Sequence, residues 1–164
     1  MRYGFLLSAM SMVVMLTLAP VPGMAGECNL VFGKDTERIL DVARGYGSAR
    51  LTKDSDGDPM IVGRMSGTKY GILFYGCDKA EGCDRIQFVA SWTDRGRKFR
   101  LQDLNWWNRT KQFGTAFLDE EGDPGILMTV NLAGGVPIGN LDETFDFWRI
   151  ALKQFKREVL KLSE

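Results

Sequence analysis

The residue types available for chemistry in this chain are carboxylates and thiols, because histidine is absent from all 164 residues. Without histidine the chain lacks the usual general base, the usual activator of a nucleophile and the commonest metal ligand. This excludes histidine-based hydrolase triads and histidine-containing zinc sites. Paired carboxylates remain, since they perform acid–base work in glycosidases. Glu120, Glu121 and Asp123 are the candidates of that type.

Two acidic segments share one pattern: residues 54–59 read DSDGDP and residues 119–124 read DEEGDP. Calcium takes several carboxylate and carbonyl oxygens, so a calcium site is one interpretation. Neither segment has the EF-hand spacing or a glutamate at position twelve. Asp, Gly and Pro are also the standard turn residues, and turn chemistry explains both segments. We therefore expect no metal ligand, no cofactor and no catalytic residue in them.

The three cysteines suggest a disulfide. Cys77 and Cys83 bracket a five-residue loop between two strand-like runs. An oxidising compartment favours their pairing. A redox-active pair is the functional alternative, but that motif has two intervening residues. We predict a structural bond between Cys77 and Cys83, with Cys28 either free or linking two chains, although three single pairings exist.

Adjacent tryptophans mark a predicted helix over residues 100–109. Leu101, Leu104 and Trp107 recur at a spacing of three and form its apolar stripe. Successive helix positions point about 100° apart, so we assign Trp107 to the core and Trp106 to the surface. Burial of both rings is the alternative. Because exposed aromatic residues carry much of the energy of protein contacts, the predicted interaction surface consists of Trp106, Asn105, Asn108 and Arg109.

The elements around these candidates follow from periodicity and turn residues. A first helix begins at Asp35 or Thr36, either of which can cap it, and ends at residues 45–47. After the tryptophan helix, Phe113, Thr115 and Phe117 alternate as in a half-buried strand. Further strands are predicted over residues 49–53, 60–65, 70–75, 86–92 and 126–132, with 70–75 and 86–92 forming a hairpin around the cysteine loop.

The last helix has the strongest pattern. Asn140 as N-cap and Glu143 three residues later predict a capping box. Apolar residues at spacings of four and three then form one continuous face, which we call the seam: Leu141, Phe145, Trp148, Leu152, Phe155, Val159 and Leu162. The pattern predicts a long helix packed on its own sheet. The alternative is that part of the seam also serves a homodimer or a partner groove.

The middle of the chain resembles a known family. It carries Trp107-Asn108-Arg109, Phe113-Gly114, Leu118-Asp119, Gly122-Asp123-Pro124 and Ala133-Gly134-Gly135. Their order and spacing are similar to the YbjN-type family of “putative bacterial sensory transduction regulators”, and the resemblance spans roughly residues 35–158. It implies the fold of type III secretion chaperones: a single α+β domain with an antiparallel sheet packed by helices, in the order α-β-β-β-α-β-β-α. Such a fold would bind extended peptides by a sheet edge or an apolar surface.

Residues 1–25 have the features of a secretory signal peptide. Arg2 supplies a positive charge, residues 5–18 are mostly apolar, and Gly23 and Ala25 place small residues at positions −3 and −1 of the cleavage site. The apolar run is shorter than the ~20 residues of a membrane span, so we predict cleavage after Ala25 and no stable membrane anchor. An uncleaved anchor is the alternative. Cleavage leaves residues 26–164 as one YbjN-like domain, located in the periplasm or secreted from a bacterium.

Charge limits the class of partner. The chain has 21 basic and 21 acidic residues, and removal of Arg2 leaves a net charge of −1. A near-neutral chain gives no electrostatic case for nucleic acid. The sequence therefore predicts a non-catalytic periplasmic binding or regulatory module, not an enzyme, that acts by contact with a protein or peptide. A small carboxylate-based enzyme and a purely structural envelope protein are the alternatives.

Overall fold

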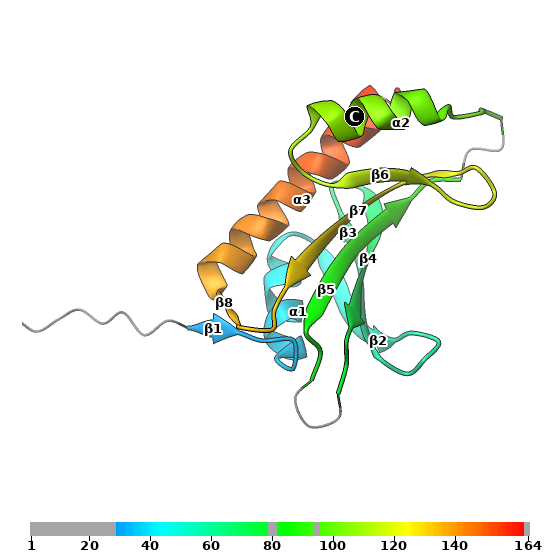
Figure 1. The fold of residues 1–164 in the computed structure, drawn as a ribbon. Helices are drawn as coiled ribbons and strands as arrows, with labels where there is room; N and C mark the ends of the chain where they lie inside the picture. The colour runs from blue at the N-terminus through cyan, green and yellow to red at the C-terminus, as the bar shows by residue number, and fades with distance from the viewer. Residues whose placement is uncertain (1–28, 79–81, 94–95, 163–164) are drawn as a thin grey trace, which may run out of the picture.

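A six-stranded antiparallel sheet, in the order β2-β3-β4-β5-β7-β6, is the central element of the fold (Figure 1). The structure is a computed structural model and describes residues 29–78, 82–93 and 96–162. The sheet strands are β2 (Ser48–Lys53), β3 (Pro59–Met65), β4 (Thr68–Tyr75), β5 (Arg85–Ser91), β6 (Thr115–Leu118) and β7 (Pro124–Asn131). A separate pair joins β1 (Leu30–Val31) to β8 (Val136–Pro137). The helices are α1 (Thr36–Gly45), α2 (Leu101–Thr110) and α3 (Ile138–Glu158).

The α+β class and the antiparallel sheet expected from the sequence are confirmed. Four strands of the sheet precede α2. This agrees with the strands predicted one by one from the sequence, whereas the arrangement implied by the family resemblance has three strands before the second helix. The short β1–β8 pair is an addition that the sequence did not indicate. The signal peptide and Cys28 lie outside the described residues. Among the described helices, none combines the length and the apolar character needed to cross a membrane.

One face of the sheet carries the core, and α1 and α3 lie on that side (Figure 1). Aromatic rings of α3 pack on the sheet: the Phe145 ring centroid is 4.9 Å from that of Phe88, and the Phe155 centroid is 5.2 Å from that of Trp92. Six seam residues, from Leu141 to Val159, are buried, whereas Leu162 is 48% exposed. The packing of α3 on its own sheet is therefore confirmed.

The predicted capping box at the start of α3 is wrong. The helix begins at Ile138, so Asn140 and Glu143 lie inside it. Pairing of β8 with β1 keeps the backbone extended as far as Pro137, which is the N-cap residue. The first free amide is satisfied by a different partner, since Ile138 N donates to Asn29 O at 3.0 Å. This bond satisfies one of the four amides that a helix start leaves without an intrahelical acceptor.

Two other local predictions also need correction. Asp35 does occupy the N-cap of α1, but its carboxylate accepts from Phe32 N at 2.9 Å and caps no helical amide. Strand β6 starts at Thr115, and its buried residue is Ala116. Phe113 precedes the strand and stacks on Phe147 with ring centroids 4.2 Å apart.

The other face of the sheet is open. Apart from Gly125, which lies under the ring of Phe117, none of the strand residues that alternate away from the core is buried. We call this surface the open face. Its apolar residues are Met60, Val62, Leu73, Val89, Leu127 and Phe117, and none of them belongs to the hydrophobic core.

Candidate interaction surfaces

Helix α2 lies beside β6 at one edge of the sheet, near the end of α3 (Figure 1). Trp107 is fully buried, its indole Nε1 donates to Gly114 O at 3.0 Å, and its ring meets Phe155 edge-on. This confirms the assignment of Trp107 to the core. Leu101 was expected on the same stripe, but it is 73% exposed because it is the first residue of the helix and lies beyond the packed turns.

Trp106 lies at the surface, as its position next to Trp107 predicts, with 41% of the side chain exposed. Lys111 Nζ lies 5.4 Å from the centroid of the Trp106 ring, which is cation–π distance. The same ammonium forms an ion pair with Glu158 at 2.5 Å. Trp106 also borders a hollow of about 320 Å³ between α2 and the end of α3. The indole is therefore held at the rim of a polar depression.

Most of the charged groups that line that hollow already have a partner within the fold. Lys111 donates to Glu158 and holds the pKa of that carboxyl below its usual value. Arg100 does the same for the pKa of Asp103. Arg97 donates to the carbonyl oxygens of Leu160 (2.6 Å) and Val159 (3.3 Å), which satisfies acceptors at the end of α3. Of the charged groups in the lining, these contacts occupy all but Lys161.

Asn108 has a structural task. Its Nδ2 donates to Ala116 O at 3.1 Å, and its Oδ1 accepts from Ala116 N at 2.7 Å. These two backbone groups point out of the sheet, because β6 is its last strand. The amide of Asn108 therefore takes the place of a neighbouring strand and closes this edge, as native proteins commonly do at exposed strands. The exposed Asn108 amide thus already makes two bonds within the fold.

The remaining predicted contact residues, Asn105 and Arg109, are exposed on α2, and the structure records no side-chain bond for either among the described residues. Leu101, Asn105 and Arg109 are four residues apart and form one row of the helix, with Trp106 next to it. We call these four residues the α2 surface. It keeps three of the four predicted residues and adds Leu101, whose exposure the spacing argument missed.

The cysteine loop closes the β4–β5 hairpin. The Cys77 and Cys83 sulfurs lie 2.17 Å apart, a bonded distance. Cys83 packs against the start of the domain, where a side chain on Gly33 would collide with Cys83 O at 1.9 Å. The bond therefore closes the end of the hairpin, and the backbone of Cys83 lies against the segment before α1.

The two acidic segments are the same turn built twice. Asp54 Oδ1 accepts from Asp56 N and Asp58 N at 3.0 and 2.9 Å. Asp119 Oδ1 accepts from the equivalent amides of Glu121 and Asp123 at 3.1 and 2.8 Å. Turn chemistry thus accounts for the first carboxylate of each segment. Within the described residues, no cluster of three or more Cys, Asp or Glu side chains is arranged to hold a metal ion.

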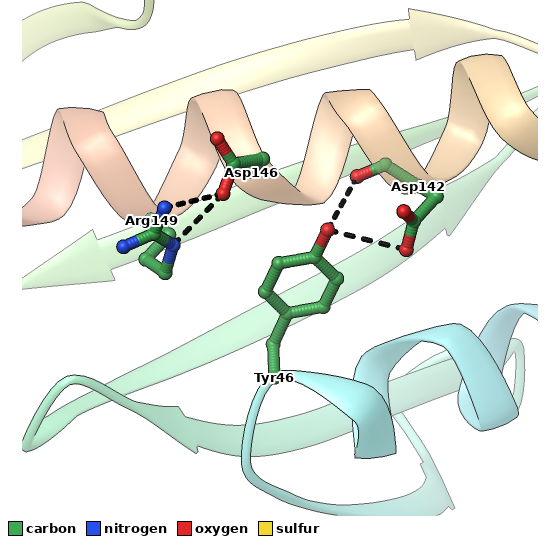
Figure 2. Close-up of polar contacts among 4 residues, drawn as sticks. All are labelled: Tyr46, Asp142, Asp146 and Arg149. Atoms are coloured by element: carbon green, nitrogen blue, oxygen red, sulfur yellow. Dashed lines mark hydrogen bonds and ion pairs between the residues drawn. The ribbon is translucent and has the colours of Figure 1, made fainter.

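Tyr46, at the end of α1, is bonded to α3 (Figure 2). Its hydroxyl lies 2.9 Å from Asp142 O and 3.1 Å from Asp142 Oδ1, and its ring stacks on Phe145. Burial and the hydrogen bond to Asp142 raise the pKa of Tyr46 to about 12. The hydroxyl therefore stays protonated at neutral pH, which suits a link between helices and not a general base. One turn along α3, Asp146 is paired with Arg149 (Figure 2).

A basic end of the open face is the feature that the sequence did not reveal. Arg50, Arg64 and Lys69 come from three different strands and border one shallow hollow of about 380 Å³, with no carboxylate in its lining. We call this the basic end. Each residue alone reads as an ordinary surface cation, and only the pairing register of β2, β3 and β4 brings them together.

Comparisons with known proteins agree with this architecture. The sequence model of the YbjN family, described as “Putative bacterial sensory transduction regulator”, matches residues 35–161. None of the curated proteins matches the chain. A solved chain in the “Structure of the HopA1-SchA Chaperone-Effector Complex” is similar, with a TM-score of 0.51 and 13% identity over 75% of this chain and 93% of that chain. At that identity the likeness shows the fold alone, and it confirms the chaperone-like fold implied by the resemblance.

Proposed function

The chain belongs to the YbjN family, and on that premise we propose that it is a non-catalytic regulatory module of the bacterial periplasm that acts by contact with another protein. The fold supports a binding role, since the similar solved chain comes from a complex of a chaperone with an effector. Two of the described carboxylates in the acidic segments, Asp54 and Asp119, already accept internal bonds from backbone amides. A binding role therefore accounts for more of the described residues than a catalytic role does.

The exposed indole of Trp106 is the observation that carries the proposal. A tryptophan that is 41% exposed beside a fully buried one has a large apolar area in contact with water. Leu101 enlarges that area, while Asn105 and Arg109 supply free polar groups at its side. Tryptophan and arginine are the residue types most enriched among the strong contributors to protein interfaces.

The periplasmic location rests on the sequence and on the thiols. A cleavable leader at residues 1–25 and a bonded pair at Cys77 and Cys83 both fit an oxidising compartment outside the cytoplasm. Within such a compartment, a small domain with a stable fold and an exposed aromatic anchor is suited to holding or sensing another protein.

The test compares capture of periplasmic proteins by the wild type and by Trp106→Ala, at equal concentration, with quantitative mass spectrometry. We expect Trp106→Ala to unfold within about 0.5 kcal/mol of the wild type, because the ring is at the surface, and to weaken capture about 30-fold, which corresponds to a loss of ~2 kcal/mol. Tyr75→Ala is the matched control, because that ring is 38% exposed and lies on the open face. It should leave capture unchanged.

Trp107→Ala calibrates the stability measurement. Removal of this fully buried ring should lower the free energy of unfolding by ~3–5 kcal/mol. If Trp106→Ala unfolds the protein as severely, the ring is part of the core and the α2 surface is not the site. If the variant is stable and captures the same proteins as the wild type, the contact lies elsewhere on the molecule.

A further inference from the structure

The two edges of the sheet are treated differently by the fold. Strand β6 is closed by Asn108, whereas β2 has no strand beyond it in the described chain. Asp54 N donates to Asp58 O in the β2–β3 hairpin. Along an antiparallel ladder, residues whose backbone groups bond to the paired strand alternate with residues whose backbone groups point away from it. The backbone groups of Ala49, Leu51 and Lys53 therefore point outward. Such a row of unpaired amides and carbonyls is a template for another strand.

The open face beside this edge carries charge of one sign. Its charged strand residues are Arg50, Arg64, Lys69 and Arg85, and it has no carboxylate, although the whole chain is neutral. Arg85 is paired with Asp84, and Arg64 donates to Gly67 O. Within the described residues the structure shows no ion pair for Arg50 or Lys69. The free cations are thus concentrated at the β2 end of the face.

The surface between these cations is hollow. The depression bordered by the basic end continues into a second one of about 310 Å³, and both are lined by Val62 and Lys69. The second is floored by Gly71, which has no side chain to fill it, and bordered by Val89. An apolar floor beside free cations suits a ligand that has both acidic and apolar groups.

We propose that the β2 edge and the basic end form a docking surface for an extended segment of another protein in which acidic and apolar residues alternate. The free backbone groups would hold the segment as an added strand. This inference shares with the proposed function only that the partner is a protein, because the surface is distinct from α2.

The register determines the pattern of the segment. Residues opposite Ala49 and Leu51 would point to the side of the helices, where these two side chains already pack against the core, so they should be apolar. Residues opposite Ser48, Arg50 and Thr52 would point to the open face and should be acidic, since opposite charges on neighbouring strands attract. A segment with this alternation satisfies both faces at once.

A second copy of the chain fits this surface less well. It would bring its own Arg50 and Lys53 to the shared edge, and like charges on paired strands are destabilising. An anionic lipid surface would use the cations but would leave the outward backbone groups of β2 unpaired. The edge and the charge together therefore favour the acidic segment.

The test uses fluorescent eight-residue peptides and anisotropy titration of the mature protein. A peptide of alternating Glu and Val should bind at least tenfold more tightly than a peptide with four Glu followed by four Val, which has the same composition. A peptide of alternating Lys and Val should also bind at least tenfold more weakly than the Glu–Val peptide. Methylation of the valine amides, which would face the β2 edge, should abolish binding, and hydrogen exchange at Ala49, Leu51 and Lys53 should slow when the parent peptide binds.

Variants of the protein locate the surface. Arg50→Glu should weaken binding of the Glu–Val peptide at least tenfold, and Lys69→Glu, two strands further from the β2 edge, should weaken it less. Arg109→Glu changes the net charge by the same amount at an exposed residue of α2 and should change binding less than twofold. Trp106→Ala should also have no effect, so that failure of this proposal and failure of the α2 contact are separate results.

Three results would overturn the proposal. The first is equal binding of the alternating and the block peptides, which would mean that charge alone acts. The second is unchanged binding by Arg50→Glu and Lys69→Glu. The third is binding to phosphatidylglycerol vesicles, or dimerisation seen by sedimentation, without binding of the Glu–Val peptide, which would assign the surface to a lipid or to a second copy.

Discussion

Asn108→Ala tests whether a single side-chain amide closes one edge of the sheet. The substitution removes two hydrogen bonds to Ala116, of 3.1 and 2.7 Å. A hydrogen bond contributes about 0.5–1.5 kcal/mol net, so the pair contributes about 1–3 kcal/mol. Water reaches this half-buried site and can replace part of the loss, and we therefore expect the lower half of that range, about 1–2 kcal/mol.

Asn105→Ala is the matched control for this measurement. Asn105 lies one turn earlier on the same helix, and the structure records no side-chain bond for it among the described residues. Alanine has the higher helix propensity, so both variants gain a similar few tenths of a kcal/mol, and that gain cancels in the comparison. Urea unfolding, with equal m-values for the two variants, measures the difference.

The outcome has a second readout besides stability. With its outward groups released, the β6 edge becomes a free template, so Asn108→Ala should also associate at high concentration while Asn105→Ala stays unchanged. Faster hydrogen exchange at Ala116 should accompany this change. Equal stability of the two variants, with unchanged exchange at Ala116, would refute the role assigned to Asn108.

Three further predictions follow from particular contacts. The pKa of Tyr46 is raised to about 12 in the folded state, so its contribution to stability is complete below pH ~10, the unfolded pKa, and is lost as the pH rises through 12. In Tyr46→Phe the loss of stability between pH 10 and 12 should therefore be smaller than in the wild type. An identical loss in the two proteins would contradict the assignment. Replacing Cys77 and Cys83 by Ser should lower the free energy of unfolding by ~2–2.5 kcal/mol, whereas Cys28→Ser should not, and alkylation of both thiols without reduction would disprove the bond. The periplasmic protein should have the mass of residues 26–164, and a full-length species there would exclude cleavage after Ala25.

Much of the fold was predictable because its elements are set by local patterns. The seam of α3, the hairpin around the cysteine loop and the two acidic turns were all expected from spacing alone, and the structure contains them. The start of α3 was mispredicted because Asn140 has the right residue type for a cap, while the actual boundary depends on the pairing of β8 with β1. That contact joins segments more than one hundred residues apart, and no local pattern records it.

The interaction surfaces were only partly predictable for the same reason. Trp106 and Trp107 were separated correctly by helical geometry, which is local. Asn108 was placed with the contact residues because sequence shows a polar residue on a helix surface and not the strand edge facing it. The basic end was missed altogether, since Arg50, Arg64 and Lys69 become neighbours only through strand register.

Most of the residues that carry the family resemblance stabilise the packing of α2, β6 and β7 on one another. Trp107 fills the core and bonds to Gly114, whose φ of 77° and close approach to Ile126 leave no room for a side chain. Asn108 closes the strand edge, and Asp119 caps the turn that follows. These roles specify a fold and leave the choice of partner to other residues. Under both proposals that choice falls mainly to side chains that are not among these residues, Trp106 on one surface and Arg50 on the other.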